Sequence, residues 1–355
     1  MRFALCVTAV VSFTAAALAQ VPAPAVTTAP ALNGAQFVTL TGSAPGQVLR
    51  YTLDGSTPTA HSPQYFAPFL VASSLTVKAV ALAGGVPGAV ATQSFAPNIP
   101  PNTLVWSDEF NAAADHGPRP DPATWTYDTG HSGFGNREFE HYCAYNDASP
   151  PCDPAHPNAF VGPDGVLHIV ARQPSPGVYT SARLKSQGLV SVYQGRLEAR
   201  IRMPEAQGLW PAFWTLGNNI ATDGWPASGE QDIMEHIDAP HPDWIAGSLH
   251  GTHGDATRHY IDTPAHPFNA ADWHTYGILW SKDKISFYVD SPFNIYATFT
   301  PAEFNRPGAV WPFDNGNAVY LLLNLAVGGN WPGPPDANAN FPAEMLVDYV
   351  RVYTH

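Results

Sequence analysis

The sequence predicts an all-β protein built from two antiparallel sandwiches of unequal size. Short runs in which apolar and polar residues alternate, such as LHIVAR and ISFYVD, recur along the chain between turn-forming residues. Few segments compete with them by showing helical periodicity. Because a proline-rich stretch separates the runs of residues 22–97 from those that follow residue 104, we expect a small domain followed by a large one.

The first 19 residues have the pattern of a signal peptide. Arg2 precedes an apolar run that is too short to span a bilayer, and the run ends in the cleavage pattern Ala17-Leu18-Ala19. A buried N-terminal strand or helix is the alternative, but the run leads directly into the proline-rich QVPAPAVTTAP. No later stretch is typical of a transmembrane helix. We therefore expect a secreted protein, extracellular or periplasmic, that has no contact with the membrane after cleavage.

Residues 22–97 contain the β-like runs QFVTLTG, VLRYTLDGS, SLTVKAVALAGG and ATQSF, and Asp54-Gly55 is a strong turn signal. This pattern predicts a small antiparallel sandwich. YTLDGSTPT, followed by SPQY and SLTVKAVAL, resembles the small immunoglobulin-like module, of chitobiase C-terminal type, that is appended to secreted bacterial hydrolases. The resemblance leaves two roles open, weak attachment to carbohydrate or cell wall and a simple spacer.

Residues 98–103 form a proline-rich linker, which we expect to be extended and semi-rigid because proline fixes φ and restricts the residue before it. We expect the linker to separate two independent cores, so that residues 22–97 are dispensable for activity on a soluble substrate. Residues 104–355 carry many further alternating segments, including GRLEARIRM, WHTYGILW and LVDYVRVY. They predict a large antiparallel sandwich with a concave face that can bind an extended polymer.

Export to an oxidising compartment makes the cysteines informative. Cys6 would leave with the signal peptide, while Cys143 and Cys152 bracket the turn-rich segment ASPP. We expect these two cysteines to form a local disulfide, with a pair of free thiols as the alternative. Two cysteines are too few for a zinc site, although histidines could contribute ligands.

The composition argues against nucleic acid and favours carbohydrate as a partner. The chain has 29 acidic and 16 basic residues, and no stretch clusters Lys or Arg into a phosphate-binding stripe. Aromatic residues make up 12% of the chain and include 10 tryptophans, while charged residues make up only 13%. Exposed aromatic faces can stack on sugar rings, although burial in the core is the commoner fate of any single tryptophan.

The stretch GEQDIMEH places Glu230, Asp232 and Glu235 within six residues. On a regular strand, Glu230 and Asp232 would face one way and Glu235 the other. A β-bulge between Gln231 and Met234 would turn all three acids toward one surface, an arrangement often found beside active sites. Three acids on a solvated strand face are the alternative.

Seven segments in this order resemble glycoside hydrolase family 16, and most closely its laminarinase-like branch of bacterial endo-β-1,3-glucanases. They are LVWSDEFN, GFGNREFEHY, DGVLHI, GLWPAFWTLG, GEQDIMEH, GSLHG, and NLAVGGNWPG through VDYVRVY. The resemblance covers nearly all of residues 104–353 and implies a concanavalin A-like β-jelly-roll with the acids on a bulged strand. Gln231 departs from the family, which usually has an aliphatic residue there. Its side chain would face the inner core, where an amide needs hydrogen-bond partners.

The resemblance also implies roles for the three acids. Retaining cleavage needs a carboxylate nucleophile and a protonated acid about 5 Å apart. By family position, Glu230 is the nucleophile and Glu235 the acid/base. Asp232 lies between them and can hold a shared proton or orient Glu230.

The resemblance suggests the residues that contact the sugar. Trp210 and Trp214 are similar to tryptophans near the cleavage subsite, and we expect at least one of them to be exposed. Asn136 and Glu138 match polar residues that bind glucose hydroxyls on the non-reducing side, whereas Arg137 is either a further contact or a surface charge. Two further candidates are His250 and Trp331.

Catalysis of this kind needs no metal and no other cofactor. The family has a structural calcium site on its convex side, bound partly by backbone oxygens, and Glu109, Gly165 and Asp348 occupy the matching segments. A purely structural Asp348, hydrogen-bonded at the last strand, is the alternative.

Three functions are compatible with the sequence. The first is an endo-acting retaining β-1,3-glucanase that acts as a monomer on β-glucan polysaccharide. The second is a related enzyme, either a mixed-linkage glucanase or a transglycosylase. The third is a non-catalytic glucan-binding protein, against which the complete acid triad argues.

Overall fold

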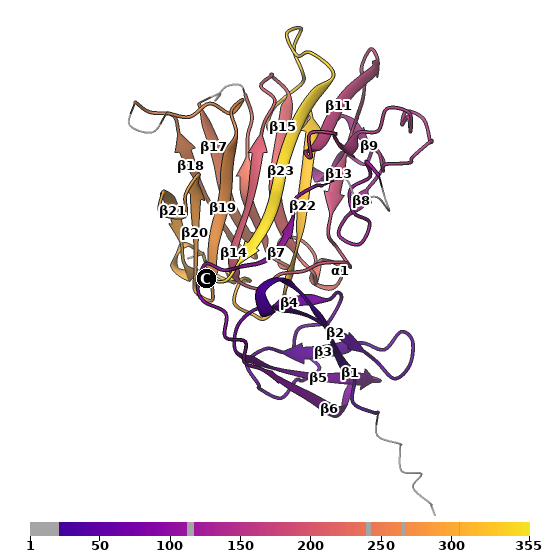
Figure 1. The fold of residues 1–355 in the computed structure, drawn as a ribbon, viewed down its shortest axis with the longest axis vertical. Coiled ribbons are helices and arrows are strands. Elements are labelled where there is room, and N and C mark those ends of the chain that lie inside the picture. Colours follow the sequence, from indigo (N-terminus) through magenta and orange to yellow (C-terminus); the bar gives the residue numbers. More distant parts are fainter. Residues whose placement is uncertain (1–20, 112–116, 239–242, 265–266, 305) are drawn as a thin grey trace, which may run out of the picture.

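The computed structural model describes residues 21–111, 117–238, 243–264, 267–304 and 306–355. They form an all-β protein with a small N-terminal sandwich below a large β-jelly-roll sandwich (Figure 1). The expected signal peptide, including Cys6, lies outside the described residues. Within the described ranges, no helix has the length and apolar character needed to cross a membrane.

The N-terminal module consists of two small sheets that enclose a core of their own. The first sheet has the order β1 (Ala25–Pro30), β2 (Gln36–Thr41) and β4 (Phe69–Val71), with η1 (Leu32–Gly34) between β1 and β2. The second has the order β3 (Leu49–Thr52), β5 (Leu75–Ala83) and β6 (Val86–Phe95). Alternate residues of β2, β3 and β5, such as Val38 and Leu40 on β2 and Val77 and Ala79 on β5, are buried between the sheets. This alternation is the one that the sequence shows.

The large domain pairs a ten-stranded sheet with a seven-stranded sheet. The first runs β21 (Ile295–Phe299), β20 (Lys284–Val289), β19 (His274–Ser281), β14 (Gly195–Arg202), β23 (Ala343–Tyr353), β11 (Leu167–Ser175), β12 (Val178–Ser181) and β9 (Glu140–Tyr142), with β10 (Ala159–Val161) beside β11 and β7 (Leu104–Asp108) beside β23. The second runs β18 (Gly254–Ile261), β17 (Trp244–Gly251), β16 (Glu230–Glu235), β15 (Leu209–Gly217), β22 (Val319–Val327), β13 (Arg183–Lys185) and β8 (Thr126–Asp128). The short helices η2 (Gly133–Gly135), α1 (Ile220–Asp223) and η3 (Pro301–Glu303) lie in connections.

The main hydrophobic core lies between these two sheets. Phe213 and Leu321 contribute to it from the seven-stranded sheet, and Leu197 and Ile278 from the ten-stranded sheet. All nine residues of β22 are buried, although only alternate ones can face this core. Two of the others, Tyr320 and Leu322, form a separate apolar cluster with Leu216. The outer face of the seven-stranded sheet is therefore covered as well, and it is the face that carries the acids.

The module and the sandwich are joined more closely than the sequence suggests. Ala35 and Leu70 of the module are buried within the main core of the sandwich, and Ala318 of the sandwich is buried within the core of the module. The two units therefore have distinct cores, but these cores meet across the boundary and are not kept apart by the linker. Hydrogen bonds also cross the boundary: Asn33 Nδ2 to Leu104 O at 2.8 Å, Ser191 Oγ to Pro68 O at 2.6 Å, Leu70 N to Ser191 O at 3.0 Å, and Tyr51 Oη to Gly316 O at 2.9 Å.

The linker is not extended throughout, because Pro101 and Asn102 form a turn in which Asn102 has a φ of 60°, and it is held in place by hydrogen bonds. Pro100 O accepts hydrogen bonds from the hydroxyl groups of Thr103 and Thr354, both at 2.7 Å. The backbone of Asn102 donates to Thr354 O at 3.1 Å. The linker is therefore tied to the end of the C-terminal strand.

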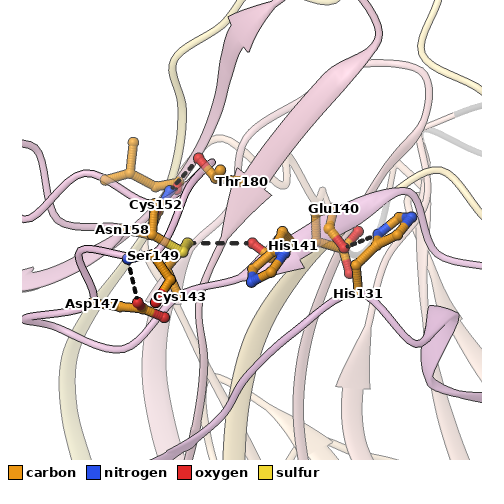
Figure 2. The surroundings of a disulfide bond; sticks show 10 residues. His131, Glu140, His141, Cys143, Asp147, Ser149, Cys152, Asn158 and Thr180 are labelled. Carbon is orange, nitrogen blue, oxygen red and sulfur yellow. Dashed lines mark hydrogen bonds between the residues drawn. A yellow bond between two sulfur atoms is a disulfide. The ribbon is translucent and has the colours of Figure 1, made fainter.

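Cys143 and Cys152 form a disulfide with a Cα–Cα distance of 5.7 Å (Figure 2). The enclosed turn has local hydrogen bonds of its own, including one from Ser149 N to Asp147 Oδ1 at 2.8 Å. Cys143 directly follows β9, so the disulfide fixes the loop at the end of the segment that carries Asn136 and Glu138.

Candidate active site

The acids lie on β16, and the expected β-bulge is present. Asp232 pairs with Ser248 of β17, but Glu235 pairs with Ala246, so three steps on β16 match two steps on β17. The same shift occurs against β15. The extra residue reverses the alternation, and Glu230, Asp232 and Glu235 all reach the outer face of the sheet.

Gly229 allows β16 to begin where it does. Its φ of 83° lies in the left-handed region, and a Cβ atom there would be 3.0 Å from Pro312 Cγ and 3.2 Å from the Phe313 ring. Only glycine meets both conditions without strain. The glycine before Glu230 is therefore part of the geometry that positions the acids.

Each of the two end glutamates accepts a hydrogen bond from an indole. Trp225 Nε1 donates to Glu230 Oε2 and Trp210 Nε1 donates to Glu235 Oε1, both at 2.9 Å. Trp225 is 61% exposed, so it forms part of the surface beside Glu230. The two indoles hold the carboxyl groups in defined orientations on the outer face.

His250 connects Asp232 to a fourth acid. Its Nε2 lies 3.1 Å from Asp232 Oδ2 and its Nδ1 lies 2.9 Å from Asp255 Oδ1. Burial alone would lower the pKa of His250, but the hydrogen bond with Asp232 and the charges of Asp232 and Glu230 raise it to about 10. An oxygen of Glu230 and one of Asp232 lie within 4.8 Å of each other and of a His250 nitrogen, a set that could also hold a metal ion. The imidazolium of His250 supplies positive charge beside these two acids.

The environment raises the pKa of both glutamates. Burial, followed by the charges of Asp232 and Glu230, raises the pKa of Glu235 well above its ordinary value. Burial and the charge of Asp232 raise the pKa of Glu230 to about 8, against the opposing effects of His250 and the Trp225 indole. Both carboxyl groups therefore hold a proton more firmly than a solvent-exposed glutamate does.

The polar residues predicted to bind sugar belong to one hydrogen-bonded chain. Asn136 Nδ2 donates to Glu138 Oε1 at 3.2 Å, and Tyr142 Oη donates to Glu138 Oε2 at 2.9 Å. Asn324 Nδ2 donates to Tyr142 Oη at 3.2 Å, and Asn324 Oδ1 accepts from Trp214 Nε1 at 2.8 Å. This chain links the loop before β9 to Trp214 in the centre of the outer face.

The tryptophans are arranged differently from the expectation. Trp210 and Trp214 are both half-buried, so the expectation that one of them is exposed is wrong. The guanidinium of Arg183 lies 4.6 Å from the centre of the Trp214 ring and covers one of its faces. Trp331, which is 37% exposed, packs edge-on against Trp210 with ring centres 5.3 Å apart. The exposed indoles near the acids are therefore those of Trp225 and Trp331.

Four residues of this surface were missed in the sequence. Asn324 left a signal, because it is the only polar side chain besides Tyr320 in the apolar run AVYLLLNLAV. Trp225 stands five residues before Glu230, but nothing in the sequence shows that its indole turns back to the carboxyl group. Tyr142 and Asp255 are ordinary strand residues in the sequence, and only the pairing of distant strands reveals their partners.

The residues predicted to bind calcium lie on converging segments, but their carboxylates are already paired. Val347 pairs with Leu167 and Val350 pairs with Asp108, so β23 brings Asp348 close to the segments of Glu109 and Gly165. Both oxygens of Glu109 accept hydrogen bonds from Arg351, at 2.9 and 2.7 Å. Asp348 Oδ2 accepts one from Arg200 at 2.7 Å. The Glu109 carboxylate is therefore not available as a calcium ligand. Among the atoms of the three predicted residues, the backbone oxygens and Asp348 Oδ1 are the candidates for binding calcium.

Comparison with known proteins agrees with this architecture. The family model "Glycosyl hydrolases family 16" matches residues 155–350, and "Chitobiase/beta-hexosaminidase C-terminal domain" matches residues 27–92. A "Beta-glucanase" of Rhodothermus marinus is 39% identical over 263 residues, which are 70% of this chain and 84% of that protein. A "Glucan endo-1,3-beta-glucosidase A1" of Niallia circulans is 34% identical over 288 residues, which are 72% of this chain but only 38% of that protein.

Solved structures of similar proteins superimpose on this chain. The endo-β-1,3-glucanase of Pyrococcus furiosus superimposes with a TM-score of 0.61 at 39% sequence identity, over 71% of this chain and 94% of that one. The catalytic domain of the Thermotoga maritima laminarinase gives the same TM-score at 34% identity, over 72% of this chain and 99% of that one. The chain therefore belongs to glycoside hydrolase family 16, and it carries an N-terminal module of the chitobiase C-terminal type.

Proposed function

We propose that this protein is a secreted, retaining endo-β-1,3-glucanase that hydrolyses laminarin-type glucan. The observation that carries the proposal is the bulge in β16, which turns Glu230, Asp232 and Glu235 toward one face, where each end glutamate accepts an indole hydrogen bond. The printed names of the Niallia circulans and Pyrococcus furiosus proteins support the β-1,3 linkage. The disulfide supports export, because such bonds persist in oxidising compartments.

In the first step, Glu235 donates its proton to the glycosidic oxygen while the carboxylate of Glu230 attacks the anomeric carbon. The bond between that carbon and the glycosidic oxygen breaks, the leaving chain departs with the proton, and a glycosyl ester forms on Glu230. In the second step, Glu235 removes a proton from water, and the water oxygen displaces Glu230 with a second inversion. The anomeric configuration of the substrate is therefore retained.

The two glutamates have similar electrostatic surroundings, so the division of roles rests on their family positions. The raised pKa of Glu235 keeps its proton available for the leaving group. Glu230 must be ionised to attack, and the Trp225 indole and His250 are the neighbours that favour its anion. Asp232, paired with His250, lies between the two and stays oriented toward Glu230.

Azide rescue tests the two roles. Glu235→Ala should nearly abolish laminarin hydrolysis but spare the first step on an aryl β-laminaribioside, whose leaving group needs no proton. Azide should then attack the accumulated glycosyl ester and give the β-glycosyl azide. Glu230→Ala should give the α-azide from the same substrate, because azide then enters from the nucleophile's side. The opposite pair of anomers would show that the two roles are reversed.

Product analysis separates the remaining functions. A mixed-linkage glucanase would cleave lichenan in preference to laminarin and curdlan, and a transglycosylase would return longer oligosaccharides rather than shorter ones. A non-catalytic glucan-binding protein would release no sugar from any of these or from agarose. Release of laminari-oligosaccharides from laminarin and curdlan alone is the expected result.

A further inference from the structure

A cavity of about 780 Å³ lies between the module and the sandwich, away from the acids of β16. It is lined by segments of the module, the linker, the sandwich and the C-terminus, which include residues 52–54, 72–75, 192–195, 280–282, 314–316 and 352–355. Neither Glu230, Asp232 nor Glu235 lines it. Its volume lies in the range of small-molecule sites, about 300–1,000 Å³.

The walls of this cavity are held together. Leu70 is buried in the core of the sandwich, and the hydrogen bond from Tyr51 Oη to Gly316 O ties the two units at the rim. The cavity segment 192–195 is anchored in the sandwich, because its last residue, Gly195, begins β14. The cavity is therefore a fixed part of the fold and not a gap that opens between loosely linked domains.

The chemistry of the walls favours a neutral, hydroxyl-rich ligand. Ser73 and Ser74 from the module and Gln194 and Asn315 from the sandwich offer groups that both donate and accept hydrogen bonds. Tyr193 adds a half-buried aromatic ring, which is held edge-on by the buried Trp280 with ring centres 5.5 Å apart. Sites that bind sugars combine these two features, an aromatic surface and amide or hydroxyl groups.

The charges of the walls exclude other ligand classes. Asp54 and Asp314 face a single lysine, Lys282, so an anion would meet more negative than positive charge. Apolar side chains such as Leu53, Val105 and Val352 also line the cavity, but a wholly apolar ligand would leave the hydroxyl and amide groups of the walls without hydrogen-bond partners.

We propose that the cavity between the module and the sandwich is a second, non-catalytic binding site for a neutral oligosaccharide. Such a site holds a glucan chain against the enzyme while another part of that chain occupies the acids, which raises the effective concentration of substrate at the active site. The choice of a β-1,3-glucan as ligand rests on the proposed function, whereas the existence of the site does not.

The test counts binding sites for laminaritriose by isothermal titration calorimetry in the full chain carrying Glu230→Gln, which suppresses hydrolysis. Ser74→Trp places an indole in the cavity from an exposed position on the module. Thr28→Trp is the matched control, since Thr28 is also exposed on the module but does not line the cavity. Lys282→Ala is a milder change that cannot block the cavity sterically. Melting curves establish that all variants are folded.

The Ser74→Trp variant should bind one molecule fewer than the Thr28→Trp control, and Lys282→Ala should weaken the second binding event about fivefold, as expected for one lost hydrogen bond. Equal numbers of bound molecules in the two tryptophan variants would overturn the proposal. Laminarin hydrolysis is measured separately with Glu230 intact. Its absence would contradict the proposed function, while the difference between the two tryptophan variants would still decide whether the cavity binds sugar.

Discussion

Replacing Gln231 with leucine should stabilise the protein, although this residue lies between two of the acids. Gln231 is fully buried on the inner face of β16, where it pairs with Thr215 of β15 and Leu249 of β17. Neither its amide oxygen nor its amide nitrogen has a hydrogen-bond partner among the described residues. Thr215 Oγ1 beside it is also unpaired within the same ranges.

The expected gain follows from the cost of burying an unpaired amide. That cost is roughly 1–3 kcal/mol in proteins, and an apolar side chain of similar shape does not incur it. Gln231→Leu should therefore raise the free energy of unfolding by about 1–3 kcal/mol. For a chain of this size the melting temperature should rise by about 2–4 °C per kcal/mol. Since the side chain points away from Glu230 and Asp232, the rate of laminarin hydrolysis should remain within about twofold of the parent.

Urea unfolding and thermal melting measure the change, with laminarin hydrolysis in parallel. Gln231→Glu is the matched control, because it keeps the shape of glutamine and adds a buried acid, and it should lower stability. Thr215→Val should raise stability by the same reasoning as the leucine variant. A leucine variant less stable than the parent would refute the reasoning, since it would mean that the glutamine amide makes hydrogen bonds worth more than the burial of leucine.

Four further changes give distinct results. Trp225→Phe removes the hydrogen bond that favours the Glu230 anion, so kcat should fall about 10- to 100-fold. The acid limb of the pH profile of kcat/KM should also move to higher pH. An unshifted limb would show that Trp225 does not favour the Glu230 anion. Burial and the charge of Glu138 raise the pKa of Glu140 well above its ordinary value, so its contribution to stability is complete below the unfolded pKa of about 4.3 and is lost as the pH rises toward the folded value. Glu140→Gln should therefore flatten the decline of melting temperature with rising pH, and an unchanged slope would count against a protonated Glu140. We propose that calcium binds near Asp348. Chelation should lower the melting temperature of the parent more than it lowers its activity, and it should not change the melting temperature of Asp348→Ala. A parent whose melting temperature does not respond to calcium would show that no such site exists. Deleting residues 21–95 should lower the free energy of unfolding by roughly 2–4 kcal/mol through loss of the Leu70 contacts while sparing laminarin hydrolysis at 25 °C, and an unchanged stability would show that the shared core contributes nothing.

The sequence was sufficient for features that depend on local alternation. The parity of GEQDIMEH required a bulge, and the same parity placed Gln231 on the core side, where it lies. It was not sufficient for contacts between segments that are distant in the chain. Asn324 and Tyr142 are 182 positions apart, and their hydrogen bond exists only because β22 passes the loop that leads into β9.

The module illustrates the same limit. A proline-rich linker predicts separation, but whether two domains pack together depends on the surfaces that they present, and Leu70 and Ala318 gave no sign of being shared. The ion pairs of the predicted calcium ligands could not be foreseen from the sequence either. Arg351 and Arg200 reach Glu109 and Asp348 from neighbouring positions in the sheet, which only the register of β23 with β7 and β14 reveals.

The place of β23 in the ten-stranded sheet has a consequence for the order in which the chain can fold. This strand, the last of the described elements along the chain, lies between β14 and β11 and also pairs with β7, the first strand of the sandwich. Until residues 343–353 leave the ribosome, both halves of that sheet have unpaired edges and the sandwich cannot close. The nascent chain therefore has no completed sandwich before residues 343–353 have been synthesised.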